Sequence, residues 1–101
     1  MVRHIILWKL KEEIQGEELE KVKNGIQEHL EGLNGVIPGL LWIMVRRTGL
    51  PSSKNADLML DSAFESEEAL KGYAVHPAHV EVANTYVRPY TAYRSCFDYE
   101  V

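Results

Sequence analysis

Three side chains that can exchange protons or hydrogen-bond a reacting group fall within one seven-residue segment. Tyr73, His76 and His79 flank Pro77 in the run Tyr-Ala-Val-His-Pro-Ala-His. An imidazole can take or give a proton near neutral pH, and a phenol can hydrogen-bond a developing enolate or alkoxide. Because a proline disfavours helical geometry at the residue before it, a kink at Pro77 could aim all three side chains toward the mouth of one pocket.

The same segment also has a purely structural interpretation. His76 can serve only to cap or orient the break in the helix, and the imidazole of His79 can bond a backbone carbonyl. From the residues alone, both the acid–base interpretation of Tyr73 and His79 and the structural one stay open.

A fourth candidate lies near the N-terminus. Alternation along residues 2–10 places His4, Ile6 and Trp8 on one face of a strand. We therefore expect these three side chains to line a small-molecule pocket together with His76. A lone histidine on a strand can equally be a structural group whose hydrogen bonds are satisfied.

Signals for metals and cofactors are weak. His76 and His79 are three residues apart and could pair as metal ligands with His4, but no Asp, Glu or Cys cluster completes a site by spacing. The glycines around residues 32–35 lack the pattern of a phosphate-binding or dinucleotide-binding loop. We therefore predict no metal site and no cofactor. The single cysteine, Cys96, is expected to be buried in the last strand and inert.

Composition narrows the class of protein. The 101 residues are 46% hydrophobic and 26% charged, which predicts one domain over residues 1–101 and excludes a disordered tail. The net charge of −4 disfavours nucleic acid and anionic membrane surfaces as partners. One cysteine forms no intrachain disulfide, so we expect a reducing, cytoplasmic environment. The apolar run at the N-terminus is too short for a membrane span, and we expect no signal peptide.

Hydrophobic periodicity and turn residues predict the order of elements. Strands are expected over residues 2–10, 40–48, 57–64 and 92–100, and helices over residues 17–33, from a Ser66 N-cap to about residue 76, and from Pro77 through about Val87. The order β-α-β-β-α-β predicts an α+β, ferredoxin-like protomer with four antiparallel strands and both helices on one face.

Apolar side chains on both faces of the sheet predict self-association. We expect Ile6, Trp8, Trp42 and Met44 to form a patch too wide to face water. The simplest cover is a second copy of the same sheet, related by a two-fold axis. Two sheets packed face to face would close into a dimeric α/β barrel whose lumen holds a small molecule or packed side chains.

The sequence resembles the stress-responsive dimeric α/β-barrel (Dabb) family along essentially its full length. The most specific segment is the His-Pro-Ala-His element at residues 76–79, and further similarity lies at residues 2–5, 57–60, 64–66 and 97–99. The resemblance implies a ferredoxin-like protomer and a homodimeric barrel. It implies no single reaction, because members of one fold family can differ in activity.

One plant branch of this family is a polyketide cyclase. Its tyrosine and the second histidine of the motif act as acid and base in an aldol-type ring closure, and by motif position these correspond to Tyr73 and His79. The branch also has a histidine matching His4, and another on its third strand where this chain has Leu58. That departure implies a more apolar cavity than the cyclases have.

Three functions therefore stay open. The chain could be a homodimeric barrel that binds a small apolar or aromatic molecule. It could be a cofactor-independent cyclase or isomerase that uses His79 as base and Tyr73 as proton donor. It could also be a structural protein whose barrel is packed solid and whose dimers form larger oligomers.

Overall fold

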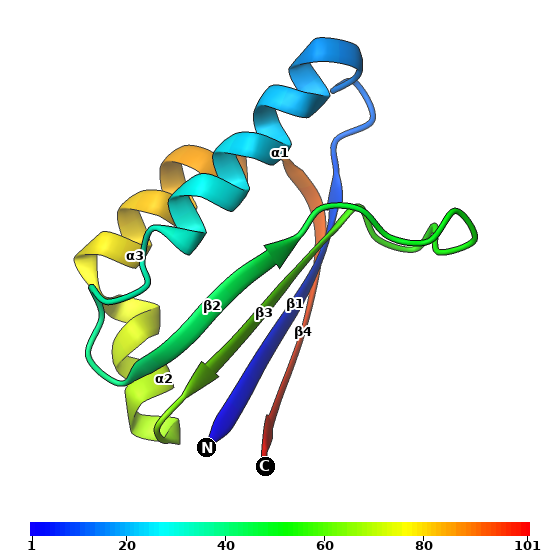
Figure 1. The fold of residues 1–101 in the computed structure, drawn as a ribbon. Helices are drawn as coiled ribbons and strands as arrows, with labels where there is room; N and C mark the ends of the chain where they lie inside the picture. Colours follow the sequence, from blue (N-terminus) through cyan, green and yellow to red (C-terminus); the bar gives the residue numbers. More distant parts are fainter.

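A four-stranded antiparallel sheet carries all the helices on one side (Figure 1). The computed structural model covers residues 1–101. The strands are ordered β2-β3-β1-β4, so the first and last strands of the chain lie side by side. This confirms the predicted α+β, ferredoxin-like protomer. The elements are β1 (Val2–Leu10), α1 (Gly16–Glu31), β2 (Leu40–Arg46), β3 (Leu58–Phe64), α2 (Glu67–Val75), α3 (Pro77–Val82) and β4 (Thr91–Glu100).

Local sequence explains where the C-terminal helices begin and end. Ser66 caps α2 as predicted, because its hydroxyl accepts a hydrogen bond from the amide of Ala69 at 3.1 Å. His76 takes an extended conformation before Pro77 and ends α2. Pro77 then starts α3, after which a π-helical segment and a 3₁₀ turn lead into β4. None of these helices, nor α1, combines the length and the apolar character needed to cross a bilayer.

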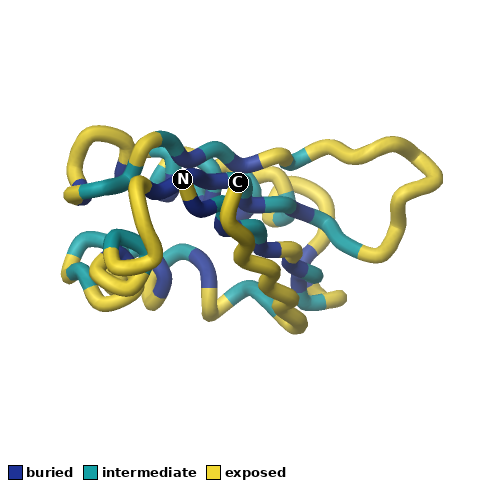
Figure 2. The backbone as a smooth tube through the Cα atoms, turned by 90° about the horizontal axis from the view of Figure 1, so that it is seen from below, coloured by how far each residue is buried: buried dark blue, intermediate teal, exposed yellow.

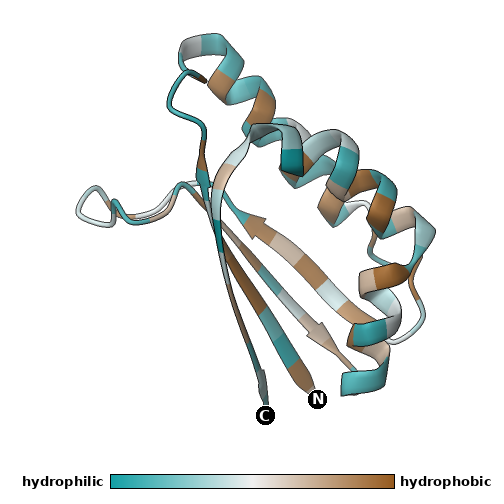
Figure 3. Ribbon diagram, turned by 180° about the vertical axis from the view of Figure 1, so that it is seen from behind, coloured by the Kyte–Doolittle hydropathy of each residue, from teal (hydrophilic) through white to brown (hydrophobic).

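The hydrophobic core lies between the sheet and the helices. Helix α1 is amphipathic, and Figure 3 shows apolar and polar bands alternating along it. Its apolar stripe packs against β2 and joins one core cluster with side chains of β1 and β3. The core cluster includes Ile6, Trp8 and Leu10 of β1, Val22, Ile26 and Leu30 of α1, Ile43 and Val45 of β2, and Leu58, Leu60 and Phe64 of β3.

The helices leave the opposite side of the sheet uncovered. The prediction of which β1 side chains lie on this uncovered face was wrong. Ile6 and Trp8 were predicted to face outward, but they are only 5% and 4% exposed and belong to the core. Side chains alternate along a strand, so the uncovered face of β1 carries Ile5 and Leu7 instead. Because both sets of side chains are apolar, composition alone did not reveal which set faces the helices.

The uncovered face nevertheless carries several exposed or half-buried apolar side chains. Trp42 lies on it as predicted, and the guanidinium of Arg3 sits 4.8 Å from the centre of its ring. Arg3 also forms an ion pair with Asp61 at 2.6 Å, so its charge is matched within the protomer. Phe97 of β4 is 69% exposed on this face, and Figure 2 shows β4 exposed along most of its length. A patch of this kind is typical of a protein–protein interface.

A charge introduced on the uncovered face should weaken the dimer. Replacing Phe97 with Glu places a charge within the expected sheet-to-sheet contact, beside Ile5 on the neighbouring strand. Burying a phenylalanine contributes about 1.5–3 kcal/mol, and about 1.4 kcal/mol is a tenfold change in a dissociation constant. The dimer dissociation constant measured by analytical ultracentrifugation should rise at least about tenfold.

The matched control is Val75→Glu, because Val75 is equally apolar and exposed but lies on α2, away from this face. The control should dissociate as the wild type does. A wild-type chain that sediments as a folded monomer at micromolar concentration would contradict the predicted interface.

Candidate functional site

Two adjoining cavities lie between the sheet and the helices. The inner one has a volume of about 340 Å³, and the outer one about 600 Å³. His4, Leu70, Ala74 and Arg94 line both, so the two cavities meet at these side chains. The site is therefore within the protomer, between the sheet and its own helices. The expected lumen between two facing sheets is not where His4, Ile6 and Trp8 point.

The inner cavity brings Tyr73, His79 and His4 together. The ring centres of Tyr73 and His79 are 4.1 Å apart, and those of Tyr73 and His4 are 6.1 Å apart. Ile6 and Trp8 line the same cavity, and Tyr73 is only 2% exposed. The break at Pro77 makes this possible, because it directs α3 so that His79 returns over the ring of Tyr73.

Burial sets the protonation state of Tyr73. Loss of water raises the pKa of its phenol far above the ordinary value of 10.0, and the positive charge of Arg94 only partly opposes this rise. The phenol therefore stays protonated at neutral pH. It can donate a hydrogen bond to a ligand oxygen or to a developing negative charge.

His79 is set up as a neutral base. Burial lowers its pKa below the ordinary 6.5, and the nearby charges of Arg88 and Arg94 lower it further, against the opposing effect of a hydrogen bond to the Ala74 carbonyl. That bond joins Nδ1 to the carbonyl oxygen at 3.3 Å. Because a carbonyl only accepts, Nδ1 carries the proton in the neutral ring and Nε2 keeps its lone pair.

His76 does not join this group. Its Nδ1 accepts a hydrogen bond from the amide of Ala78 at 3.1 Å and so caps α3. It lines a separate groove beside Gly39 and Glu65, and neither of the two cavities. The structure therefore favours the structural interpretation of His76 over its predicted place in the pocket.

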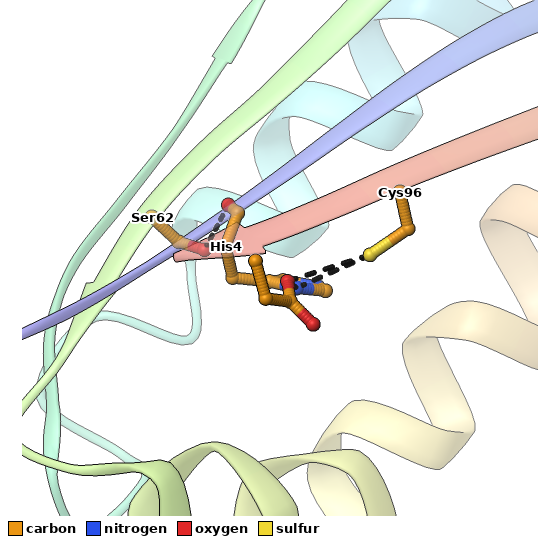
Figure 4. A network of polar contacts seen from close by, with 4 residues as sticks. His4, Ser62 and Cys96 are labelled. Carbon is orange, nitrogen blue, oxygen red and sulfur yellow. Dashed lines mark hydrogen bonds and ion pairs between the residues drawn. The ribbon is translucent and has the colours of Figure 1, made fainter. Parts of the chain in front are cut away.

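On its other side, His4 meets two side chains from β4. Its Nδ1 donates to the carboxylate of Asp98, and the sulfur of Cys96 lies 3.6 Å from Nδ1 and 3.4 Å from the Asp98 oxygen. Figure 4 shows Cys96 pointing from its strand toward His4. The hydroxyl of Ser62, fully buried, donates to the backbone carbonyl of His4 at 2.8 Å and fixes the strand there.

The sequence did not reveal this cluster. Asp98 is 94 residues from His4, and the two meet only because β1 and β4 pair with His4 opposite Asp98 and Ile6 opposite Cys96. Residues paired across antiparallel strands point to the same face, so all four side chains share one side of the sheet. The feature that could have predicted this cluster is the ferredoxin-like strand order, in which the first and last strands are neighbours.

The expectation for Cys96 was wrong in one respect. Its side chain is exposed rather than buried, because β4 is an edge strand and the helices do not cover it fully. The pKa of its thiol is raised, chiefly by partial burial and then by the Asp98 carboxylate. A protonated thiol is a poor nucleophile, so the free protein offers no activated cysteine here.

Comparison with known families supports the expected resemblance. The sequence model of the family described as "Stress responsive A/B Barrel Domain" matches residues 2–101. A search of curated proteins found no match.

Solved structures share the fold. A dimeric protein of unknown function and ferredoxin-like fold from Bacteroides fragilis is 32% identical, with a TM-score of 0.90, and the match covers 99% of this chain and 95% of that one. A dimeric ferredoxin-like protein of unknown function from Thermobifida fusca is 21% identical (TM-score 0.79, 99% and 90% covered). A hydroxynitrile lyase from Passiflora edulis is 16% identical (TM-score 0.73, 97% and 90% covered). The last two likenesses show a shared fold and no more.

The environment of His79 predicts a pH dependence. The folded protein holds the neutral imidazole, whereas the unfolded chain protonates it near pH 6.5. The stability that comes from the neutral ring is therefore present above pH 6.5 and is lost as the pH falls from there toward the lower folded pKa. An NMR titration should place the midpoint of His79 below 6.5.

The same shift should appear in unfolding measurements. Below that pH, the free energy of unfolding from urea titrations should fall less steeply in His79→Gln than in the wild type. A His79 midpoint at or above the ordinary value would rule out the half-buried, neutral ring.

Proposed function

The chain belongs to the stress responsive A/B barrel family, and from this premise we propose that it is a homodimeric protein whose protomer binds a small apolar or aromatic molecule in the inner cavity. The observation that carries the proposal is the composition of that cavity. Apolar side chains make up most of its wall, and Tyr73, His79 and His4 are grouped on one part of it. Ligand sites of small molecules commonly combine such an apolar wall with a few polar groups.

Charge at the cavity refines the kind of ligand. Arg88 and Arg94 line it, and no carboxylate does. A ligand with an apolar or aromatic body and an oxygen that carries partial or full negative charge would satisfy both the arginines and the phenol of Tyr73. The volume of about 340 Å³ is suited to a ligand of one or two rings rather than a large cofactor. A cavity of this volume supports the binding of a small molecule over a purely structural role.

Self-association is the other part of the proposal. The related proteins of known structure from Bacteroides fragilis and Thermobifida fusca are described as dimeric. The uncovered face of this sheet carries exposed apolar side chains that a second copy would cover. Because this face is opposite the helices, the second copy would not cover the inner cavity, which lies between the sheet and the helices.

Filling the cavity should weaken binding. Ala74 lines both cavities from α2, so Ala74→Leu adds bulk at their junction without removing a polar group. Against a panel of phenols and aromatic acids, calorimetry should detect wild-type binding that weakens at least about tenfold in this variant, since the added methyl groups occupy ligand space.

The matched control is Ala92→Leu, at an exposed position outside both cavities. It should bind as the wild type does. A panel with no binder, or equal binding by both variants, would remove the basis for this function.

A second candidate function is supported by the contact between Tyr73 and His79. A neutral imidazole with a free Nε2 can accept a proton from a carbon beside a carbonyl, and the protonated phenol can donate to the resulting enolate oxygen. The chain would then be a cofactor-independent cyclase or isomerase in which His79 is the base and Tyr73 the donor. The absence of a histidine at Leu58 leaves fewer polar groups for a polar substrate.

Proton exchange tests this candidate without a known product. Aromatic β-diketones in D₂O should exchange the hydrogen between their carbonyl groups faster with the wild type than in buffer, as followed by NMR. His79→Ala should slow the enzyme-dependent exchange about 100-fold or more, as expected for loss of a general base. Tyr73→Phe should slow it less.

His76→Gln is the control, because His76 lies outside the cavity and caps a helix. Its exchange rate should match the wild type once folding is confirmed by circular dichroism. If His79→Ala remains a folded dimer and exchanges at the wild-type rate, His79 is not the base.

A further inference from the structure

His4, Cys96 and Asp98 converge on the wall of the outer cavity, apart from the pair formed by Tyr73 and His79. We propose that these three side chains bind a divalent transition-metal ion of the zinc type. Imidazole nitrogen, thiolate sulfur and carboxylate oxygen are the three ligand types that zinc accepts in proteins. A mixed set that includes sulfur disfavours magnesium and calcium, which prefer oxygen ligands alone.

The separations fit a tetrahedral ion. Zinc–sulfur bonds of about 2.3 Å and zinc–nitrogen or zinc–oxygen bonds of about 2.0 Å place the sulfur about 3.5 Å from each other ligand atom. The sulfur of Cys96 lies 3.6 Å from Nδ1 of His4 and 3.4 Å from the Asp98 oxygen. For the ion to enter, the hydrogen bond between His4 and Asp98 must open, and the thiol of Cys96 must give up its hydrogen bond to Asp98.

Binding exchanges protons for the ion in a balanced way. The thiol of Cys96 loses its proton to solvent and binds as a thiolate. The proton that His4 shares with Asp98 leaves Nδ1 and is replaced by one on Nε2, so the imidazole stays neutral. One proton is released for each ion bound. The thiolate and the carboxylate then balance the two charges of the ion.

The surroundings permit a cation. Lys71 and Arg94 line the outer cavity, but Glu67 and Glu100 line it as well, so the wall carries no net positive charge before the ligands are counted. Because Cys96 and Asp98 are exposed, an ion can reach the site from solvent.

The ligands come from rigid, paired strands. His4 lies opposite Asp98 across β1 and β4, and the buried hydroxyl of Ser62 holds the backbone of His4 (Figure 4). Three protein ligands leave the fourth position of the ion facing the outer cavity, where water or a ligand atom can bind. This arrangement is typical of zinc sites that exchange a ligand rather than of closed structural sites.

The site can be tested with the metal alone. The reduced wild type, titrated with Zn²⁺ in a calorimeter, should bind one ion per chain. Co²⁺ bound in its place should show the intense visible bands of tetrahedral cobalt and a charge-transfer band from thiolate. Neither measurement depends on a substrate, so this proposal can fail while the proposed ligand-binding function holds, and the reverse.

Variants at the exposed positions identify the ligands. Cys96→Ser and Asp98→Asn should each weaken Zn²⁺ binding by more than the roughly 10- to 100-fold that loss of a supporting hydrogen bond costs. Cys96→Ser should also remove the thiolate band. Because both residues are exposed, these variants should fold as the wild type does, whereas His4 is buried and its replacement would disturb the core.

The control variant is His29→Gln, because His29 lies on α1 against Tyr86, outside both cavities. It should bind Zn²⁺ with wild-type affinity. The proposal is overturned if the wild type binds no ion saturably. It is also overturned if Cys96→Ser keeps wild-type affinity, or if cobalt binds without a thiolate band.

Discussion

The site depends on which side chains of β1 face the helices, because His4 lies on this strand. This strand is paired on both sides, with β3 and with β4, and its even-numbered side chains face the helices. His4 therefore points into the protomer beside Tyr73, and Ile6 and Trp8 enter the core with it. A shift by one residue would turn all of them to the uncovered face, because side chains alternate along a strand. The packing of the apolar core determines which side chains of β1 face the helices, and it therefore also places His4 in the site.

The break at Pro77 gives the residues of one short motif different roles. Tyr73 precedes the break and His79 follows it, and the change in direction brings their rings into contact. His76 lies at the break itself, and its Nδ1 accepts a hydrogen bond from the amide of Ala78. A histidine in that position stabilises the turn between α2 and α3, but its Nδ1 lone pair is already engaged and cannot bind a ligand. The motif therefore combines two residues that face the cavity with one that keeps the turn in place.

Much of this architecture was predictable because its signals are local. The strand at residues 2–10, the Ser66 cap and the break before Pro77 were found where periodicity and backbone chemistry indicated. The orientation of Ile6 and Trp8 was not predictable, because both faces of their strand are apolar and only the packing of the helices decides between them. The proximity of Asp98 and Cys96 to His4 was also missed, because it depends on strand pairing across more than ninety residues.

Strand β4 has a further consequence for how copies of the chain can meet. It is a long strand at the edge of the sheet, with an unpaired backbone side that could accept a strand from another molecule. Arg94, Asp98 and Glu100 place charges along it, and charged edge strands resist such pairing. The charged side chains of β4 that line the outer cavity therefore also disfavour edge-to-edge pairing of sheets, which would otherwise let copies of the chain aggregate.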